Sequence, residues 1–571
     1  TEFSNDATKE IYVYNKEEAN VEFKINSSTN KVTYVETTQA SSQKFTTVND
    51  TTVTDGYGYN FEKITTETDT PLTVRMTGQP NELIMSKPAY NKTEAQNFAM
   101  GDRYLRVTAK DGSTMSASGS GVNADGYFKI VLKSQTYKYS IQEPAENGNK
   151  IGVTDIDNLT ATDIQKIKDQ IKIEYSKTST DARLESKKGQ LVDNQNSIVK
   201  RIDVDTTSKK VVVTYTDDST DETPLSNIAR TNEKPTVEIE YSDPAADKKE
   251  VYVYASEVNT FDIKIKDDSG KLASAELKRG SNQDFKDVAG ETNKQDTQYG
   301  FTANKFTSET TATADNPAVI TYTGTPAPEG AFTEAKLKEV TKGENPPGIA
   351  LGWRFVKAID NDGADARGNG RDATDPTAVN VVLKPQTLKY DIKEVAQADK
   401  LPVADASNVT EAEFNEIKKR VEIQYSKTNP DKRLESKRGE VLTNRDERVD
   451  TITRDGNNLV VTYKDGSTDT KPLTDFARTN VAPTVSIPYS DPAPNKKEVY
   501  LYTGEEADVD ITFNDDSGKI KSAALKKGGN IALNNVGGNP DLQDNEWGFT
   551  VTAINSETAT PAKIKVTGQV S

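Results

Sequence analysis

A long internal repeat constrains this chain more than any other feature. The segment TNEKPTVEIEYSDPAADKKEVY, beginning at Thr231, returns as TNVAPTVSIPYSDPAPNKKEVY, beginning at Thr479; sixteen of the 22 positions are identical at an offset of 248 residues. Repeats of this kind reflect structural units in tandem, each contacting mainly its neighbours along the chain. We therefore expect an elongated series of domains rather than one globule.

The first part of the repeated unit has the alternation of half-buried strands. Ile263 and Ile265 flank Lys264, so the two apolar side chains share one face. Turn signals such as DDSGK separate the short strands, and this pattern predicts an immunoglobulin-like sandwich. The three copies open with KEIYVY, KEVYVY and KEVYLY, at Lys9, Lys249 and Lys497.

The second part of the unit carries a helix signal. In VTEAEFNEIKKRV, Thr410 and Glu413 form a capping box, in which side chains satisfy free N–H groups at a helix start. Phe414, Ile417 and Val421 follow at helical spacing. Strands such as LVVTYKDGSTDTKPL come next, so we expect a small mixed module with one helix on a short sheet.

These patterns predict a mainly β chain, an elongated rod of tandem immunoglobulin-like sandwiches that alternate with small α+β modules. Near-identical Pro-containing segments link the modules, and Pro favours extended chain, so we expect a defined angle between neighbours. The predicted domains are sandwiches at 1–135 and 236–385, mixed modules at 136–235 and 386–482, and a partial sandwich at 483–571.

The composition excludes several functions. The chain has no Cys and no His, so disulfides, thiolate nucleophiles and the commonest general base are missing. Its net charge of −17 disfavours nucleic-acid binding. No apolar stretch is long enough for a membrane span, and the polar start is not a secretory signal. Carboxylate pairs alone do not define a glycosidase. We therefore expect a non-enzymatic protein.

Two stretches resemble families of bacterial surface proteins. NVTEAEFNEIKKRVEIQYSKTNPDKRLESKRG, with VTYKDGSTDTKPL after it, resembles Rib-type repeats, although Lys464 stands where that family usually has Pro. KEVYVYASEVNTFDIKIKDDSGKLASAELKRG is similar to bacterial immunoglobulin-like modules. Their alternation resembles the non-helical part of giant staphylococcal extracellular-matrix-binding surface proteins.

The resemblance implies a cell-wall-attached, extracellular Gram-positive adhesin, associated with virulence, that binds a host extracellular-matrix protein such as fibronectin. The alternative is a structural stalk or a cell–cell biofilm module without a host ligand. We expect a monomer in either case. Neither family supplies a binding motif that can be carried over to this chain.

Acidic loops provide the candidate metal ligands. AIDNDGADARGNGRDATDP crowds carboxylates on a Gly-rich loop, and Ca²⁺ takes six to eight oxygen ligands. An EF-hand loop needs a Glu at its twelfth position, and Arg371 stands there instead. A solvated turn explains the same residues. Calcium is therefore the one cofactor that we consider, and the sequence requires no cofactor. Asp267–Asp268 offers a second place for calcium, with the same alternative. The candidate ligands are Asp360, Asp362, Asp365, Asp372 and Asp375.

Two further features are open to a functional interpretation. Tyr252 and Tyr254 alternate on one face and could anchor a partner, but we interpret them as a sandwich edge that covers its own core. LESKKG at Leu184 and LESKRG at Leu434 are basic segments in an acidic chain. We interpret both as solvated loops.

Overall fold

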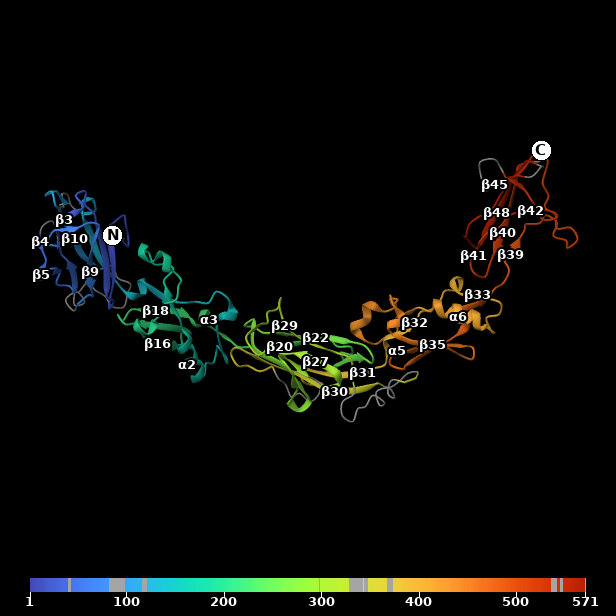
Figure 1. Ribbon diagram of the computed structural model, residues 1–571, viewed down its shortest axis with the longest axis horizontal. Coiled ribbons are helices and arrows are strands. Elements are labelled where there is room, and N and C mark those ends of the chain that lie inside the picture. The colour runs from blue at the N-terminus through green and yellow to red at the C-terminus, as the bar shows by residue number, and fades with distance from the viewer. Residues whose placement is uncertain are drawn as a thin grey trace.

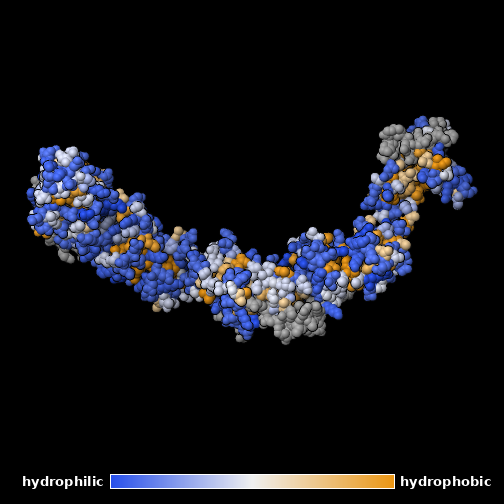
Figure 2. Space-filling view, viewed as in Figure 1, coloured by the Kyte–Doolittle hydropathy of each residue, from blue (hydrophilic) through white to orange (hydrophobic). Residues whose placement is uncertain are grey.

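The computed structural model describes residues 1–39, 43–81, 98–115, 121–296, 298–327, 342–343, 348–366, 373–535, 542–544 and 548–569. Figure 1 shows β-rich units that follow one another along a curved, elongated arc, with the two termini at opposite ends. Most of the visible surface is hydrophilic, and apolar residues form small patches (Figure 2). The mainly β, rod-like tandem fold predicted from the repeat is confirmed.

The first sandwich consists of two facing sheets with one apolar core between them. One sheet has the order β1-β12-β10-β3-β4, and β1 runs parallel to β12. The other has the order β2-β9-β7-β6-β5. The strands are β1 (Glu10–Tyr14), β2 (Ala19–Ile25), β3 (Lys31–Gln39), β4 (Gln43–Lys44), β5 (Thr46–Asn49), β6 (Thr52–Thr54), β7 (Tyr59–Glu62), β8 (Thr68–Asp69), β9 (Leu72–Gly78), β10 (Phe98–Ala109), β11 (Thr114–Met115) and β12 (Tyr127–Lys133).

The second sandwich repeats this arrangement and adds an edge strand, β20, beside β22. Ile263 and Ile265 are fully buried while Lys264 is exposed, so the predicted strand register is confirmed. The strands are β20 (Thr236–Ile239), β21 (Glu250–Tyr254), β22 (Asn259–Lys266), β23 (Lys271–Arg279), β24 (Gln283–Asp284), β25 (Lys286–Val288), β26 (Glu291–Asp296), β27 (Phe301–Asn304), β28 (Thr310–Thr311), β29 (Ala318–Gly324), β30 (Ile349–Asp360) and β31 (Ala378–Lys384).

Each mixed unit packs one long helix on small sheets. Thr410 and Glu413 form the predicted capping box of α6 (Glu411–Arg420), and Thr160 and Asp163 form that of α2 (Ala161–Gln170). The first unit's other elements are β13 (Tyr139–Ile141), β14 (Ile151–Val153), β15 (Ile173–Tyr175), β16 (Val199–Asp205), β17 (Lys210–Tyr215), β18 (Thr220–Pro224), α3 (Leu225–Ile228) and β19 (Ala229–Thr231). The second unit's are α5 (Gln386–Lys389), β32 (Tyr390–Ile392), β33 (Leu401–Val403), β34 (Ile423–Tyr425), β35 (Val449–Asp455), β36 (Asn458–Tyr463), β37 (Thr468–Pro472) and β38 (Ala477–Thr479).

The third β unit keeps the sheet that contains the β22-like strand, in the order β39-β40-β48-β46-β45-β44. Ile511, Val551 and Ile564 are the centre of its smaller core. Its strands are β39 (Thr484–Ser486), β40 (Ala507–Asn514), β41 (Lys519–Ile520), β42 (Lys526–Lys527), β43 (Ile531–Ala532), β44 (Asn534–Asn535), β45 (Leu542–Asp544), β46 (Phe549–Thr552), β47 (Thr558–Ala559) and β48 (Ala562–Gly568).

The segments between units belong to the sheets on either side. β19 pairs with β14 in the first mixed unit, and β20 then pairs with β22 in the second sandwich. Only 232–235 lie between β19 and β20. A link this short, held by pairing at both ends, restricts the angle between units. No helix in the described part of the chain is long and apolar enough to cross a membrane.

Candidate functional site: the junctions between units

The most elaborate side-chain chemistry of the chain lies where units meet. Two kinds of junction alternate. A tyrosine junction joins each sandwich to the mixed unit after it, and an arginine junction joins each mixed unit to the β unit after it. Their residues come from strand ends and from the turns that those strands lead into.

The tyrosine junction is centred on a buried carboxylate. The Tyr14 hydroxyl donates to Asp181 Oδ2 at 2.9 Å, and the Tyr254 hydroxyl donates to Asp431 Oδ2 at 3.0 Å. Both carboxylates are fully buried. Strand β1 or β21 projects the tyrosine forward, and the turn after β15 or β34 presents the aspartate. The same bond therefore joins two units in both copies.

An arginine two residues after that aspartate extends the contact to the backbone. Arg183 Nη2 donates to the carbonyl of Tyr12 at 2.6 Å, and Arg433 Nη2 donates to the carbonyl of Tyr252 at 2.6 Å. Each guanidinium also donates to the aspartate of its own turn. An ion pair inside each mixed unit thus anchors a bond to the main chain of the preceding sandwich.

A glutamine at the start of each mixed unit makes a reciprocal pair with a turn aspartate. The backbone N–H of Gln386 donates to Asp465 Oδ2 at 2.7 Å, and the Asp465 N–H donates back to Gln386 Oε1 at 3.1 Å. Gln135 and Asp217 make the same two bonds at 2.8 and 3.1 Å. Both glutamines are fully buried.

A sandwich glutamate completes the junction. Glu257 Oε2 accepts from Lys389 Nζ at 2.6 Å, and its other oxygen accepts from Gln386 Nε2 at 3.1 Å. Glu17 accepts from Lys138 and Gln135 in the first copy. The glutamate contacts cross the boundary between units, so separating the units would leave the charged groups of Glu257 and Lys389 without partners.

Burial controls the protonation of these groups. Burial alone would raise the pKa of Asp181, but the Arg183 and Tyr14 bonds hold that pKa below its ordinary value. Burial raises the pKa of Asp217 and of Asp465 above the ordinary value, against the opposing bonds from Ser219 and Ser467 respectively.

The arginine junction is a charged contact between a mixed unit and the turns at the near end of the β unit that follows it. Arg230 Nη1 donates to Asp268, and Arg230 Nη2 donates to Asp362 Oδ2 at 2.8 Å. Lys166 on α2 donates to Asp362 Oδ1 at 2.9 Å. Burial raises the pKa of Asp268 although the Arg230 guanidinium opposes the shift.

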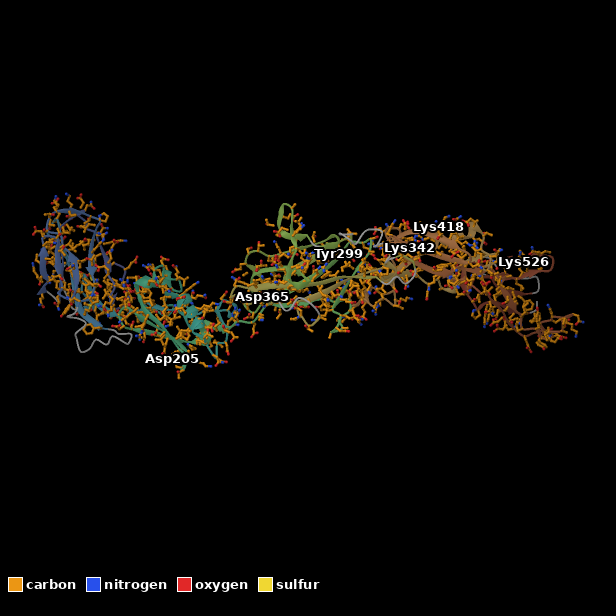
Figure 3. All side chains as sticks on the ribbon, turned by 90° about the horizontal axis from the view of Figure 1, so that it is seen from below. Asp205, Tyr299, Lys342, Asp365, Lys418 and Lys526 are labelled. Carbon is orange, nitrogen blue, oxygen red and sulfur yellow. The ribbon has the colours of Figure 1, made fainter. Side chains whose placement is uncertain are left out.

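The candidate calcium ligands are divided between this junction and other places. Asp360 Oδ2 accepts from Asn232 at 2.7 Å, and its Oδ1 accepts the backbone N–H groups of Asp362 and Ala364. Asp365 lies at the end of the second sandwich near the first mixed unit (Figure 3). Its backbone forms an isolated antiparallel β-bridge with Ile359.

The other two candidates lie apart from this contact. Asp375 caps the turn before β31, where it accepts from the Thr377 N–H and hydroxyl, and Asp372 is outside the described residues. Among the described residues, no group of three or more acidic side chains is placed to hold a metal ion. The structure brings Asp360 and Asp362 together with cationic and amide donors of the preceding unit. Calcium binding by this loop stays a prediction.

Sequence reasoning missed the tyrosine junction. The tyrosines do lie on a sandwich edge strand, β21, but Tyr254 packs with Val382, Leu388 and Leu434, so the interpretation that they cover their own core was wrong. The interpretation of LESKKG as a solvated loop was also wrong at its first residue, because Leu184 is buried against Tyr12 and Tyr14. The signal was present in the repeat, since both copies place Asp-x-Arg-Leu directly before Glu-Ser-Lys.

In the described part of the third copy, the same tyrosine segment is exposed. The described residues contain no strand that corresponds to β31 in that unit, and 497–502 forms no strand there. Tyr500 is 47% exposed and Tyr502 is 63% exposed, whereas Tyr252 and Tyr254 are 5% and 2% exposed. The difference in exposure between the second and third copies shows that β31 and the second mixed unit cover this segment in the second copy.

Comparison with solved structures gives neighbours among streptococcal surface adhesins. The sialic acid binding region of a Streptococcus sanguinis SK1 adhesin, bound to 3'sLn, is 18% identical, with 82% of this chain and 96% of that chain covered and a TM-score of 0.40. The SrpA adhesin of Streptococcus sanguinis is 18% identical, with 44% and 96% covered and a TM-score of 0.24. A structure described as the GspB Siglec domain is 14% identical, with 43% and 97% covered and a TM-score of 0.19.

The first two of these neighbours are described as adhesins of Streptococcus sanguinis. No family model matches the chain. No curated protein matches it either. The Rib-type resemblance therefore stays a prediction.

Proposed function

We propose that the chain is a semi-rigid segment of a Gram-positive surface adhesin, and that it holds adhesive surfaces away from the cell wall. The observation that carries the proposal is the tyrosine junction, whose bonds recur in both copies with donor–acceptor distances that differ by at most 0.3 Å. A contact repeated this closely fixes the direction in which one unit leaves another. When each junction has a fixed direction, the units together form an elongated chain.

The absence of catalytic chemistry in the sequence agrees with this role. A chain without Cys or His lacks the usual nucleophile–base pairs, and its charged groups at the junctions are paired with each other. We propose a non-enzymatic, extracellular, monomeric rod that is attached to the cell wall.

For the ligand, we propose a host extracellular-matrix protein such as fibronectin. The sequence resemblance to matrix-binding surface proteins supports this choice. The structural neighbours include a sialic acid binding region and a Siglec domain, so sialylated glycans are the competing ligand class for the test below.

The second candidate is a stalk or cell–cell module without a host ligand. The observation that favours it is the placement of the repeated residues, because TNEKPTVEIEYSDP and TNVAPTVSIPYSDP supply junction and strand positions. A spacer needs its junctions to recur and does not need its loops to do so.

Two measurements test the proposal. Small-angle scattering of the whole chain should give a radius of gyration well beyond about 25 Å, the value for one compact globule of this length. A compact profile overturns the rod. Binding of the whole chain to immobilised fibronectin, other matrix proteins and sialylated glycans, with self-association measured in parallel, separates the two functions. Self-association alone supports the stalk.

A further inference from the structure

The second tyrosine junction contains a groove that the junction contacts do not use. It has a volume of about 840 Å³, within the roughly 300–1,000 Å³ typical of ligand pockets. The second sandwich supplies one wall through Glu240, Val258 and Phe261, and the second mixed unit supplies the other through Lys389 and Leu434. The groove therefore exists only where these two units are held together.

One wall of the groove is a strand edge with pairing on one side only. Strand β20 pairs with β22 from Thr236 opposite Lys266 to Ile239 opposite Ile263, and there it ends. The preceding residues of β22, 259–262, pair with β29 and have no partner in β20. An antiparallel strand directs alternate N–H and C=O groups to each side, so this stretch presents main-chain groups to the groove.

An exposed apolar side chain stands at the start of this open edge. Val258 is 73% exposed, more than any other exposed large hydrophobic residue in the described part of the chain. The corresponding positions of the first and third copies are Glu18 and Glu506. A single exposed valine is ordinary on a protein surface, and its place at the start of the open strand edge is what makes it an apolar contact for a ligand on that edge.

The groove also carries charges that no ion pair within it satisfies. Among the described residues, Glu240, Asp262 and Lys264 form no salt bridge, while Lys389 is paired with Glu257 and Arg433 with Asp431. Lys264 lies opposite Glu238, so the groove holds both signs of charge beside an open strand edge, and this suits a chain of alternating side chains. They do not form the single-sign cluster that an anion requires.

From these observations we infer that the groove binds an extended peptide. The peptide adds to the open edge of β22 at 259–262, in line with β20 and antiparallel to β22. Its main chain pairs with β22, one apolar side chain packs on Val258, and its polar side chains face Glu240 and Lys264. The inference rests on the adhesive function proposed above and names the chemistry of its partner.

The test uses the whole 571-residue chain and an array of blocked six-residue peptides that alternate Val, Ile, Leu or Phe with Thr, Lys or Glu. Val258→Glu is the matched variant, because it installs the residue found in the two other copies and should leave the melting temperature unchanged. We expect that some peptides of the array bind the wild-type chain, and that the same peptides bind V258E at least tenfold more weakly. N-methylation at alternate peptide nitrogens should weaken the same peptides at least tenfold.

Three results would overturn the inference. The first is an array in which no peptide prefers the wild type to V258E, and the second is binding that N-methylation leaves unchanged. The third is a sialylated-glycan array whose binding V258E abolishes, since this would assign the groove to a saccharide. Each result leaves the scattering measurement untouched, so failure of the peptide site and failure of the rod are distinguishable.

Discussion

The tyrosine and arginine junctions both hold two neighbouring units together, but they do so with different chemistry. The Tyr254 hydroxyl and the Arg433 guanidinium meet a fully buried carboxylate and a main-chain carbonyl, and the first copy repeats these contacts. Arg230 meets two carboxylates that are 24% and 17% exposed, while Arg478 meets only Asp516 among the described residues. Buried hydrogen bonds resist salt, and exposed charges are screened by it. We therefore expect both kinds of junction to restrict the angle between units, and only the arginine junction to loosen when salt is added.

The largest expected effect comes from removing a tyrosine at the stiff junction. Tyr254→Ala should lower the free energy of unfolding of the second sandwich by about 3–5 kcal/mol, because it empties a buried aromatic site and removes the hydrogen bond that Asp431 accepts from the neighbouring unit's tyrosine. Denaturant unfolding followed at Trp353, in a Trp547→Phe background that leaves a single tryptophan, measures this loss.

Tyr502→Ala is the matched control for that prediction. The third-copy tyrosine is 63% exposed, so its removal should cost less than about 0.5 kcal/mol in the third β unit, followed at Trp547 with Trp353 replaced by Phe. Losses of equal size at the two positions would show that coverage by the following unit is not what stabilises Tyr254.

A smaller effect is expected at the arginine junction. Arg230→Ala should cost about 1.5–3 kcal/mol, the usual range for a hydrogen bond to a charged group, because Asp268 loses its cationic partner while Asp362 keeps Lys166. The chain has no Cys, so spin labels on two introduced cysteines report the distance between the first mixed unit and the second sandwich. That distance distribution should broaden.

Salt and a second variant sharpen the comparison between junctions. High salt should broaden the distribution across the arginine junction and leave the one across the tyrosine junction unchanged. Arg478→Ala, with its single partner, should cost about 1 kcal/mol or less. Equal salt responses at the two kinds of junction would contradict the distinction drawn between them.

A third prediction concerns how the stability of the second sandwich depends on pH through Asp267, a residue next to the arginine junction. Burial raises the pKa of Asp267 above its ordinary value of 3.8, and the nearby carboxylates of Asp268 and Asp360 add to the shift. A raised folded-state pKa contributes stability below pH 3.8 that is lost as the pH rises through the folded pKa. Asp267→Asn should therefore stabilise the second sandwich at pH 7, by less than about 1 kcal/mol.

The control for Asp267→Asn is the same measurement in acid. Asn keeps the oxygen that accepts from Ser269, so the turn is preserved. At about pH 3 the wild-type group is mostly protonated, and the advantage of Asn should disappear. A melting-temperature gain of the same size at both pH values would refute the explanation by charge burial.

The smallest expected effect is that of chelation. Asp360 and Asp362 already accept bonds from Asn232, Arg230 and Lys166, so removal of Ca²⁺ with EDTA should change the melting temperature by less than about 2 °C. A drop of several degrees, restored by added Ca²⁺ but not by Mg²⁺, would establish the calcium site.

The sequence predicted the fold better than it predicted the junctions, and the reason is physical. Alternation around Ile263 and the capping box at Thr410 are local patterns, each determined by residues a few positions apart. The Tyr14–Asp181 bond joins residues 167 positions apart, and nothing in the sequence near Tyr14 identifies its partner. The acidic loop was noticed from its composition, but the donor at Arg230 lies 132 residues before Asp362.

The close approach of Gly152 to Asp362 fixes the order of the units. A side-chain carbon at Gly152 would lie 2.2 Å from Asp362 Oδ2, and Lys166 binds the same carboxylate. The second mixed unit has Pro402 and Glu416 at the matching positions. Recombination that duplicates one period would place a copy of the second mixed unit directly before a copy of the second sandwich, and so bring Glu416 and the Pro402 ring against Asp362. Such a duplication would set an acid against an acid, so the ends of these units are matched to their neighbours in the array.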